Sequence, residues 1–326
     1  MRAIVYEEFG PAEVLHLAEV PVPQIRPSDL LVKVGAAGVN RADLLQRNGF
    51  YGAQQFGESP LLGLEVAGEV IAIGDAVTDI EVGARVMAIV GGGGYGAFAR
   101  VDRAMAVPIP DSMSFHQAAA VMESFVTAVE AVSHLAGVKA GQSVLIHSAA
   151  GGIGSAAVQL AHSLGAVVYA TASAARHEDV LGLGADAVID YRTSDFEAEI
   201  AALTNGAGVD AIVDFVGGDY LARNLRSLKP GGVLVQVGIL SGENDAVIPL
   251  NLVLHNHLRL VGTVMKSRTP QEKRAMVQRF AERALPLFAA GKLRPLLDHA
   301  FPLAQAAEAH RRMEKGGGFG KIVLTL

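Results

Sequence analysis

The sequence predicts an α/β protein that combines a Rossmann-type, doubly wound parallel sheet with a second, mostly antiparallel domain. Strand and helix patterns alternate from residue 143 to residue 262, and a glycine-rich turn follows the first of these strands. The preceding stretch reads as short strands separated by Gly and Pro. Alternating apolar strands and helices are typical of a parallel sheet whose two faces are both covered by helices.

The bulk composition excludes several classes of function. The chain has 326 residues, of which 51% are hydrophobic and 18% charged, so it can bury two sizeable cores. The net charge is −6, and no block of Lys and Arg gives a basis for binding nucleic acid or an anionic membrane. The absence of cysteine excludes disulfides, a thiolate nucleophile and cysteine-bound zinc.

The chain also shows no targeting signal. Its first residues, MRAIVYEEFG, lack the basic start and apolar run of a signal peptide. No apolar stretch approaches the ~18 residues that a membrane span requires. We therefore expect a soluble, cytoplasmic protein that acts on a small molecule and has no nucleic-acid or membrane partner.

The strands of the first part of the chain suggest an antiparallel, barrel-like unit. Its predicted strands cover residues 30–34, 66–73, 85–90, 95–101 and 106–109. Residues 270–290 predict one long amphipathic helix, and residues 321–326 a last strand. Because a lone terminal strand needs a sheet to join, we place it in the N-terminal domain, which is then discontinuous. The predicted division is 1–118 and 265–326 for this domain and 119–264 for the Rossmann domain.

The turn between residues 144 and 154, VLIHSAAGGIG, indicates a site for the pyrophosphate of a dinucleotide. In the G-x-G-x-x-G register its three positions are Ala149, Gly151 and Gly154, so the first glycine is replaced. The second position lets the backbone approach the pyrophosphate, and the third lets helix and strand pack closely. The alternative is a turn that only packs a helix on a sheet, but the strand–turn–helix context favours the dinucleotide. The expected contacts are Ala150, Gly151, Gly152, Ile153 and Gly154.

The second strand of this domain indicates which dinucleotide binds. NAD sites commonly place an acid at the end of that strand to hold the ribose 2′-hydroxyl. Here the strand ends at Ser173, and Arg176 follows. A hydroxyl and a guanidinium suit a 2′-phosphate, so we predict NADPH. Tyr191, after the third strand, would flank the same group or the adenine. The alternative for Arg176 is a solvated surface residue.

Several segments spread over nearly the whole chain resemble the medium-chain dehydrogenase/reductase superfamily. They are residues 38–43 (GVNRAD), 63–68 (GLEVAG), 83–86 (GARV), 149–154 and 320–324 (GKIVL). Residues 40–51 (NRADLLQRNGFY) and 264–268 (VMKSR) are similar to the zinc-free, zeta-crystallin-type quinone oxidoreductases, in particular their tumour-suppressor-inducible branch. The resemblance implies a GroES-like barrel for the N-terminal domain and a homodimer joined through strand 258–262.

The resemblance also implies that no metal is bound. Asn40 and Leu64 stand where the zinc enzymes have their first cysteine and their histidine, and the second cysteine falls near Glu123. Asp43 and Glu65 persist and would serve structure. Without a Lewis acid the site suits acceptors that are already electron-poor, such as quinones or conjugated carbonyl compounds.

The family pattern then supplies the remaining site residues. Asn40 and Tyr51 are the expected catalytic residues, and Tyr51 could instead be a packing residue. The further expected cofactor contacts are Asn40, Thr127, Val216, Gly238, Ile239, Met265 and Lys321, with Lys321 near phosphate.

The leading hypothesis is an NADPH-dependent quinone oxidoreductase. Its rivals are a double-bond reductase for enones, enals or acyl thioesters and, from another class, an NADPH-binding structural protein with little turnover.

Overall fold

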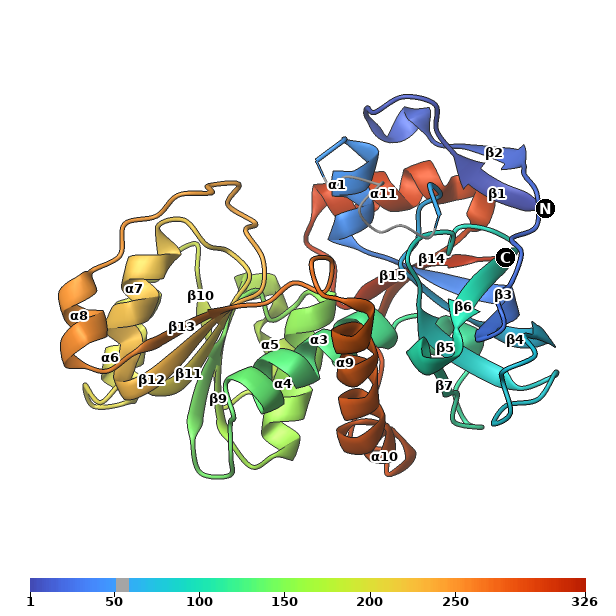
Figure 1. Ribbon diagram of the computed structural model, residues 1–326. Helices are drawn as coiled ribbons and strands as arrows, with labels where there is room; N and C mark the ends of the chain where they lie inside the picture. Colours follow the sequence, from blue (N-terminus) through green and yellow to red (C-terminus); the bar gives the residue numbers. More distant parts are fainter. Residues whose placement is uncertain (51–58) are drawn as a thin grey trace. The chain divides into compact units, whose positions relative to one another are not determined.

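The computed structural model describes residues 1–50 and 59–326 (Figure 1). Its contacts divide the chain into two compact units. Unit 1 comprises Met1–Val126, Thr269–Glu282 and Pro295–Leu326, and unit 2 comprises Thr127–Arg268 and Arg283–Arg294. In the described residues, no helix combines the length and apolar character needed to cross a bilayer.

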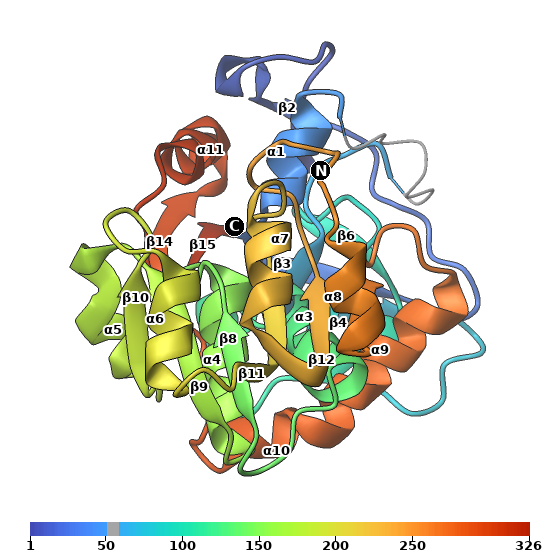
Figure 2. The same cartoon turned by 90° about the vertical axis from the view of Figure 1, so that its left-hand side faces the viewer.

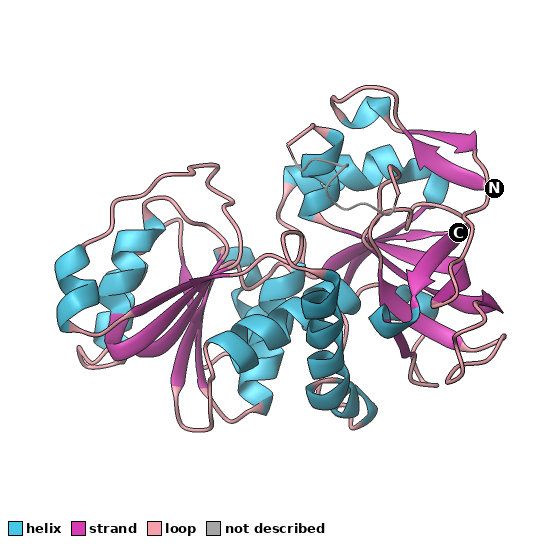
Figure 3. Ribbon diagram, viewed as in Figure 1, coloured by secondary structure: helices cyan, strands magenta, loops and turns pink. Residues whose placement is uncertain are grey.

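The core of unit 2 is a sheet of six parallel strands, which confirms the predicted doubly wound architecture (Figure 3). The strand order is β10-β9-β8-β11-β12-β13, so the winding direction reverses between β8 and β11. The strands are β8 Ser143–Ile146, β9 Val167–Ala172, β10 Ala187–Asp190, β11 Val209–Asp214, β12 Leu228–Gln236 and β13 Arg259–Gly262. Open α/β sheets bind ligands at such a reversal, beyond the carboxyl ends of the strands.

Helices cover both faces of this sheet (Figures 1 and 2). One face carries α4 Gly152–Ser163 and α5 His177–Leu181, and the other carries α6 Phe196–Leu203, α7 Tyr220–Ser227 and α8 Leu250–His255. The strands are apolar because both faces are buried, as Leu145, Ile212 and Leu234 illustrate with 0% exposure. Strand β13 ends the sheet and leaves Leu260 42% exposed, so the edge at which self-association is expected is open.

Unit 1 is built on a seven-stranded sheet with the order β14-β15-β3-β4-β5-β7, and β6 also pairs with β3. All pairs are antiparallel except β14–β15. The strands are β3 Asp29–Val39, β4 Glu65–Ile73, β5 Arg85–Ile89, β6 Phe98–Asp102, β7 Ala106–Pro108, β14 Leu297–Pro302 and β15 Lys321–Thr325, beside a separate pair, β1 Arg2–Val5 and β2 His16–Glu19. The terminal strand β15 thus lies against β3.

The remaining helices lie in unit 1 or at a boundary of the units, except α10, which belongs to unit 2. They are α1 Arg41–Arg47, α2 Phe115–Ala118, α3 Met122–Ala128, α9 Pro270–Arg283, α10 Leu285–Ala289 and α11 Ala306–Lys315. Helix α3 runs on into a π-helical segment, Val129–Leu135. Short 3₁₀ segments cover Ala12–Val14, Arg103–Met105, Ala174–Arg176 and Leu303–Gln305.

One expectation about the helices is wrong. Residues 270–290 form two helices, α9 and α10, instead of one long helix. Pro286 lies at the start of α10. A proline in a helix interior lacks the N–H donor and clashes with the preceding turn, whereas it is tolerated in the first turn. The chain therefore ends one helix at Arg283 and begins another at Leu285.

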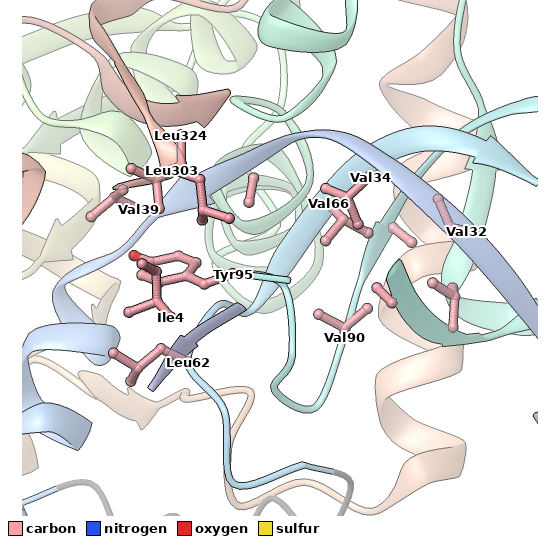
Figure 4. Close-up of a cluster of buried hydrophobic side chains, with 14 of the residues drawn as sticks. Ile4, Val32, Val34, Val39, Leu62, Val66, Val90, Tyr95, Leu303 and Leu324 are labelled. Atoms are coloured by element: carbon pink, nitrogen blue, oxygen red, sulfur yellow. The ribbon is translucent and has the colours of Figure 1, made fainter. Parts of the chain in front are cut away.

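The core of unit 1 combines distant parts of the chain. Figure 4 shows Ile4, Tyr95, Leu303 and Leu324 in one cluster with valines from the sheet. Ile4 comes from β1 and Leu324 from β15, and both are almost completely buried. The unit therefore closes its core only when the end of the chain joins its beginning.

Two leucines at the end of the chain test this dependence. Leu324 has 0% exposure and Leu326 has 37%. We predict that Leu324→Ala lowers the free energy of unfolding by about 2–5 kcal/mol, because it leaves a cavity in the core. Leu326→Ala should cost less than about 1 kcal/mol. Chemical denaturation of both variants measures the difference, and equal losses would contradict the central role of β15.

Candidate functional site

The segments that follow the six parallel strands lie at one edge of the sheet of unit 2. Most of the predicted cofactor residues belong to these segments. They are Gly151–Gly154 after β8, Ser173 after β9, Tyr191 after β10, Val216 after β11, Gly238 and Ile239 after β12, and Met265 after β13. Their common position is the carboxyl edge, where this class of sheet binds ligands. Thr127 lies on α3, and its contact with a cofactor stays a prediction, as do those of the other residues.

The two glycines of the turn, Gly151 and Gly154, differ in whether the fold leaves room for a side chain. A Cβ on Gly154 would lie 2.3 Å from the carbonyl oxygen of Ser148 and 2.8 Å from Cα of Ala149, so helix α4 packs against the turn too closely for any side chain. At Gly151 the backbone is extended (φ −75°), and a Cβ would meet only the oxygen of Ser148, at 3.4 Å. The fold itself therefore does not require glycine at 151. A phosphate approaching the N-terminus of α4 would require it, so these residues fit a dinucleotide.

A chain of buried hydrogen bonds holds the ends of β8, β9 and β11 together. Nδ1 of His147 lies 3.1 Å from Oγ1 of Thr171, and Nε2 lies 2.8 Å from Oδ1 of Asn224. The amide nitrogen of Asn224 donates to Asp214 (3.1 Å). Asp214 also accepts the N–H groups of Val216 (2.7 Å) and Gly217, so it shapes the loop that follows β11.

The partners of His147 fix its protonation state. Because the amide oxygen of Asn224 can only accept, Nε2 carries the proton, and Nδ1 accepts from the hydroxyl of Thr171. Burial lowers the pKa of His147, so the ring is neutral. Sequence reasoning missed this network. The sequence hints at this network only through a polar residue at the end of a buried strand or directly after it, such as Asp214 and His147.

Ser173, Arg176 and Tyr191 are gathered at the same edge. Strands β9 and β10 pair in register up to Ala172 and Asp190, so Ser173 and Tyr191 occupy the next position on each strand. Arg176 donates from Nη1 to Asp179 Oδ2 at 3.1 Å, and its side chain is 29% exposed. A guanidinium and a hydroxyl are thus present where a ribose substituent is expected.

In unit 1, the carboxylate of Glu65 lies at the centre of a buried polar cluster. Nζ of Lys321 lies 2.6 Å from Oε1 of Glu65, and the two side chains are 6% and 1% exposed. Lys321 also donates to Oδ1 of Asn40 (2.5 Å) and to the backbone oxygen of Val39 (3.1 Å). These contacts use all three donors of the ammonium group. A contact between Lys321 and phosphate, as predicted, would require one of them to be exchanged.

Glu65 also connects two other parts of the site. Its Oε1 accepts from Nδ2 of Asn40 (3.0 Å), and its Oε2 accepts from the backbone N–H of Glu123 (2.9 Å). The amide of Asn40 is therefore held at both ends, by Lys321 and by Glu65. Because both ends of this amide are engaged, Asn40 is better suited to a positioning role than to direct contact with a substrate.

The start of α1 is fixed by a second buried acid, Asp43. Its carboxylate accepts from the backbone N–H groups of Asn40 (2.8 Å) and Gly63 (3.1 Å) and from the hydroxyl of Tyr95 (3.1 Å). Burial raises the pKa of Asp43 to about 6, and these donors oppose the rise. The hydroxyl of Tyr95 also meets Nε2 of His310 at 3.2 Å. Asp43 and Glu65 thus have the structural contacts expected of them.

Tyr51 lies outside the described residues. Among the residues that are described, no group of three or more His, Cys, Asp or Glu side chains is arranged to hold a metal ion. At the positions that correspond to zinc ligands, Asn40 is held by Lys321, Leu64 is 5% exposed in the apolar core, and Glu123 is an acid.

Known families match both parts of the chain. Residues 26–111 match the alcohol dehydrogenase GroES-like domain, and residues 183–324 match the family described as zinc-binding dehydrogenase. The human synaptic vesicle membrane protein VAT-1 homolog is 32% identical over all of this chain and 86% of its own length. The spectinabilin polyketide synthase system protein NorB of Streptomyces orinoci is 36% identical over 97% of this chain, which spans only 14% of that protein.

Solved structures agree in fold over almost the whole chain. An NAD-dependent alcohol dehydrogenase (30% identity) matches with a TM-score of 0.90, and the match covers 100% of this chain and 100% of that chain. The CurK enoyl reductase (29%) has a TM-score of 0.90 and covers 99% of this chain and 98% of its own. The quinone oxidoreductase of Coxiella burnetii (32% identity) has a TM-score of 0.82, and the match covers 100% of this chain and 99% of that protein's chain. This chain therefore belongs to the medium-chain dehydrogenase/reductase family, which is a family of oxidoreductases.

The glycine turn gives a matched pair of variants. Gly151→Ala should fold normally, since its backbone and surroundings accept a methyl group, but it should weaken NADPH binding at least about tenfold by blocking the phosphate. Gly154→Ala should lower the free energy of unfolding by about 1–3 kcal/mol, because the helix must move away from Ser148. Chemical denaturation and fluorescence titration measure the two effects. Unchanged NADPH affinity in Gly151→Ala would refute the phosphate assignment.

Proposed function

We propose that this protein reduces quinones with NADPH and uses no metal. The observation that carries the proposal is the buried ammonium of Lys321, which lies 2.5 Å from Asn40 and 2.6 Å from Glu65. A cation already occupies the polar centre of unit 1, so a divalent metal there would meet a like charge. The residues at the zinc-ligand positions support the same proposal because they include the apolar Leu64.

The choice of acceptor follows from the proposal that no metal acts as a Lewis acid. An acceptor that no metal polarises must itself be electron-poor, as quinones are. When bound, the nicotinamide supplies the hydride. The carboxyl edge of unit 2 would hold the dinucleotide through the glycine turn and the strand-end segments. In unit 1, the contacts of Lys321, Glu65 and Asn40 keep the start of α1 and the start of α3 in fixed positions.

A second candidate acts on a different acceptor. The similarity to the CurK enoyl reductase favours reduction of a conjugated double bond. The quinone oxidoreductase from Coxiella burnetii favours the first proposal. Both reactions need the same cofactor and an electron-poor acceptor, so the described site serves either.

The cofactor proposal rests on residues of unit 2. Ser173 and Arg176 present a hydroxyl and a guanidinium at the end of β9, where NAD-specific sites commonly place an acid. A 2′-phosphate would form charge-assisted hydrogen bonds with these groups. This argument favours NADPH, although one structural neighbour is described as NAD-dependent.

An acceptor panel tests the proposed function. We expect NADPH oxidation with 1,2- or 1,4-quinones to exceed that with 2-alkenals by at least about tenfold in kcat/KM, a difference of about 1.4 kcal/mol in transition-state stabilisation. Steady-state assays at fixed pH measure both. A higher value for 2-alkenals would replace the proposal with the double-bond reductase. NADPH binding without oxidation by any acceptor would indicate a protein with little turnover.

A charge reversal tests the cofactor assignment. Arg176→Glu should lower the ratio of kcat/KM for NADPH to that for NADH by about 10–100-fold, because charge-assisted bonds to the phosphate contribute about 1.5–3 kcal/mol. Arg226→Glu is the matched control, since Arg226 pairs with Glu197 on the helical face of the same unit (2.7 Å). It should leave the ratio unchanged. The assignment fails if the ratio in Arg176→Glu equals that of the wild type.

A further inference from the structure

Helix α3 has one face that is not completely buried. Of its seven residues, Met122–Ala128, only Glu123 and Thr127 are partly exposed, and the other five are buried. Residues four apart lie one above the other on the same side of a helix. Glu123 therefore shares this partly exposed face with Thr127, one of the residues expected to contact the cofactor.

The backbone of Glu123 is held by the same side chain that holds Asn40. Oε2 of Glu65 accepts the N–H of Glu123 at 2.9 Å, and Oε1 accepts Nδ2 of Asn40 at 3.0 Å. Glu65 is in turn fixed by Lys321 at 2.6 Å. The position of Glu123 is thus set by the buried cluster, while its own carboxyl group takes part in none of these contacts.

The carboxyl group of Glu123 has no hydrogen-bond partner within the part of the chain that the structure describes. The charged groups around it are Glu65 on β4, Asp43 on α1, Lys321 on β15 and Lys273 on α9. Burial and the nearby charge of Glu65 raise the pKa of Glu123 to about 8, and the two lysines only partly oppose this rise. At neutral pH the group is therefore a carboxylic acid with an uncommitted proton.

We propose that Glu123 is the proton donor of the reduction, placed by Glu65 on the partly exposed face of α3. Bound NADPH would supply the hydride, and the quinone would take its proton from the carboxylic acid, so that the O–H bond of Glu123 breaks and one O–H bond of the hydroquinone forms. The carboxylate then recovers its proton from water. This proposal rests on the proposed function and names the acid that such a reaction would use.

Kinetics of Glu123→Gln test the proposal directly. A positioned general acid contributes about 10²–10⁴-fold, so kcat should fall by at least about 100-fold while the Kd for NADPH stays within about threefold. Glu123→Asp should recover part of the loss. In the wild type, kcat should fall as the pH rises through about 8, and Glu123→Gln should lack this step. Glu69→Gln, at an exposed position of β4, is the control and should leave every value unchanged.

Stability without cofactor gives a second readout. The pKa of Glu123 is raised from 4.5 to about 8 on folding, so its protonation stabilises the protein fully below pH 4.5, and this contribution is lost as the pH rises through 8. Glu123→Gln should therefore reduce the decline in the free energy of unfolding between pH 5 and pH 8. Chemical denaturation at several pH values measures this slope.

The outcomes separate this proposal from the proposed function. Wild-type kcat and pH profile in Glu123→Gln would overturn the donor role alone, and so would an unchanged pH slope of stability. A wild-type protein that reduces neither quinones nor 2-alkenals would overturn the proposed function, and the donor role with it.

Discussion

The ion pair between Lys321 and Glu65 is the constraint on which the rest of unit 1 depends. The two side chains are almost completely buried, and a buried charge is tolerated only when it is paired and hydrogen-bonded. Lys321 begins the last strand, whereas Glu65 begins β4. Their contact brings the end of the chain to the middle of the sheet. Through Asn40 and the N–H of Glu123 it also fixes the starts of α1 and α3.

In unit 2, a buried polar network around the neutral ring of His147 holds the strand ends in place. The neutral ring of His147 links β8 to β9 through Thr171 and to α7 through Asn224. Asp214 completes the chain and holds the backbone after β11. Buried polar groups are costly unless all of them are satisfied, so this network selects one arrangement of the strand ends. The glycine turn can then offer its N–H groups at a defined place.

The sequence predicted those strands and helices that have a regular spacing of apolar residues. The strands predicted over residues 66–73 and 85–90 are found as Glu65–Ile73 and Arg85–Ile89, because apolar spacing within a segment identifies such elements. Strands β2 and β14 were missed since they are largely exposed and carry little apolar pattern. In the site, the glycine turn was readable from its context. The partners of Lys321 were not, because Glu65 and Asn40 meet it only through tertiary folding and no local pattern records such a contact.

A double-mutant cycle between Lys321 and Glu65 tests most directly whether this pair organises the buried polar cluster of unit 1. Lys321→Met and Glu65→Gln should each lower the free energy of unfolding by about 3–5 kcal/mol, because each leaves an uncompensated buried charge. We predict that the double variant loses clearly less than the sum, with a coupling free energy of at least about 2 kcal/mol. Additive losses, with no coupling between the two positions, would contradict the claim.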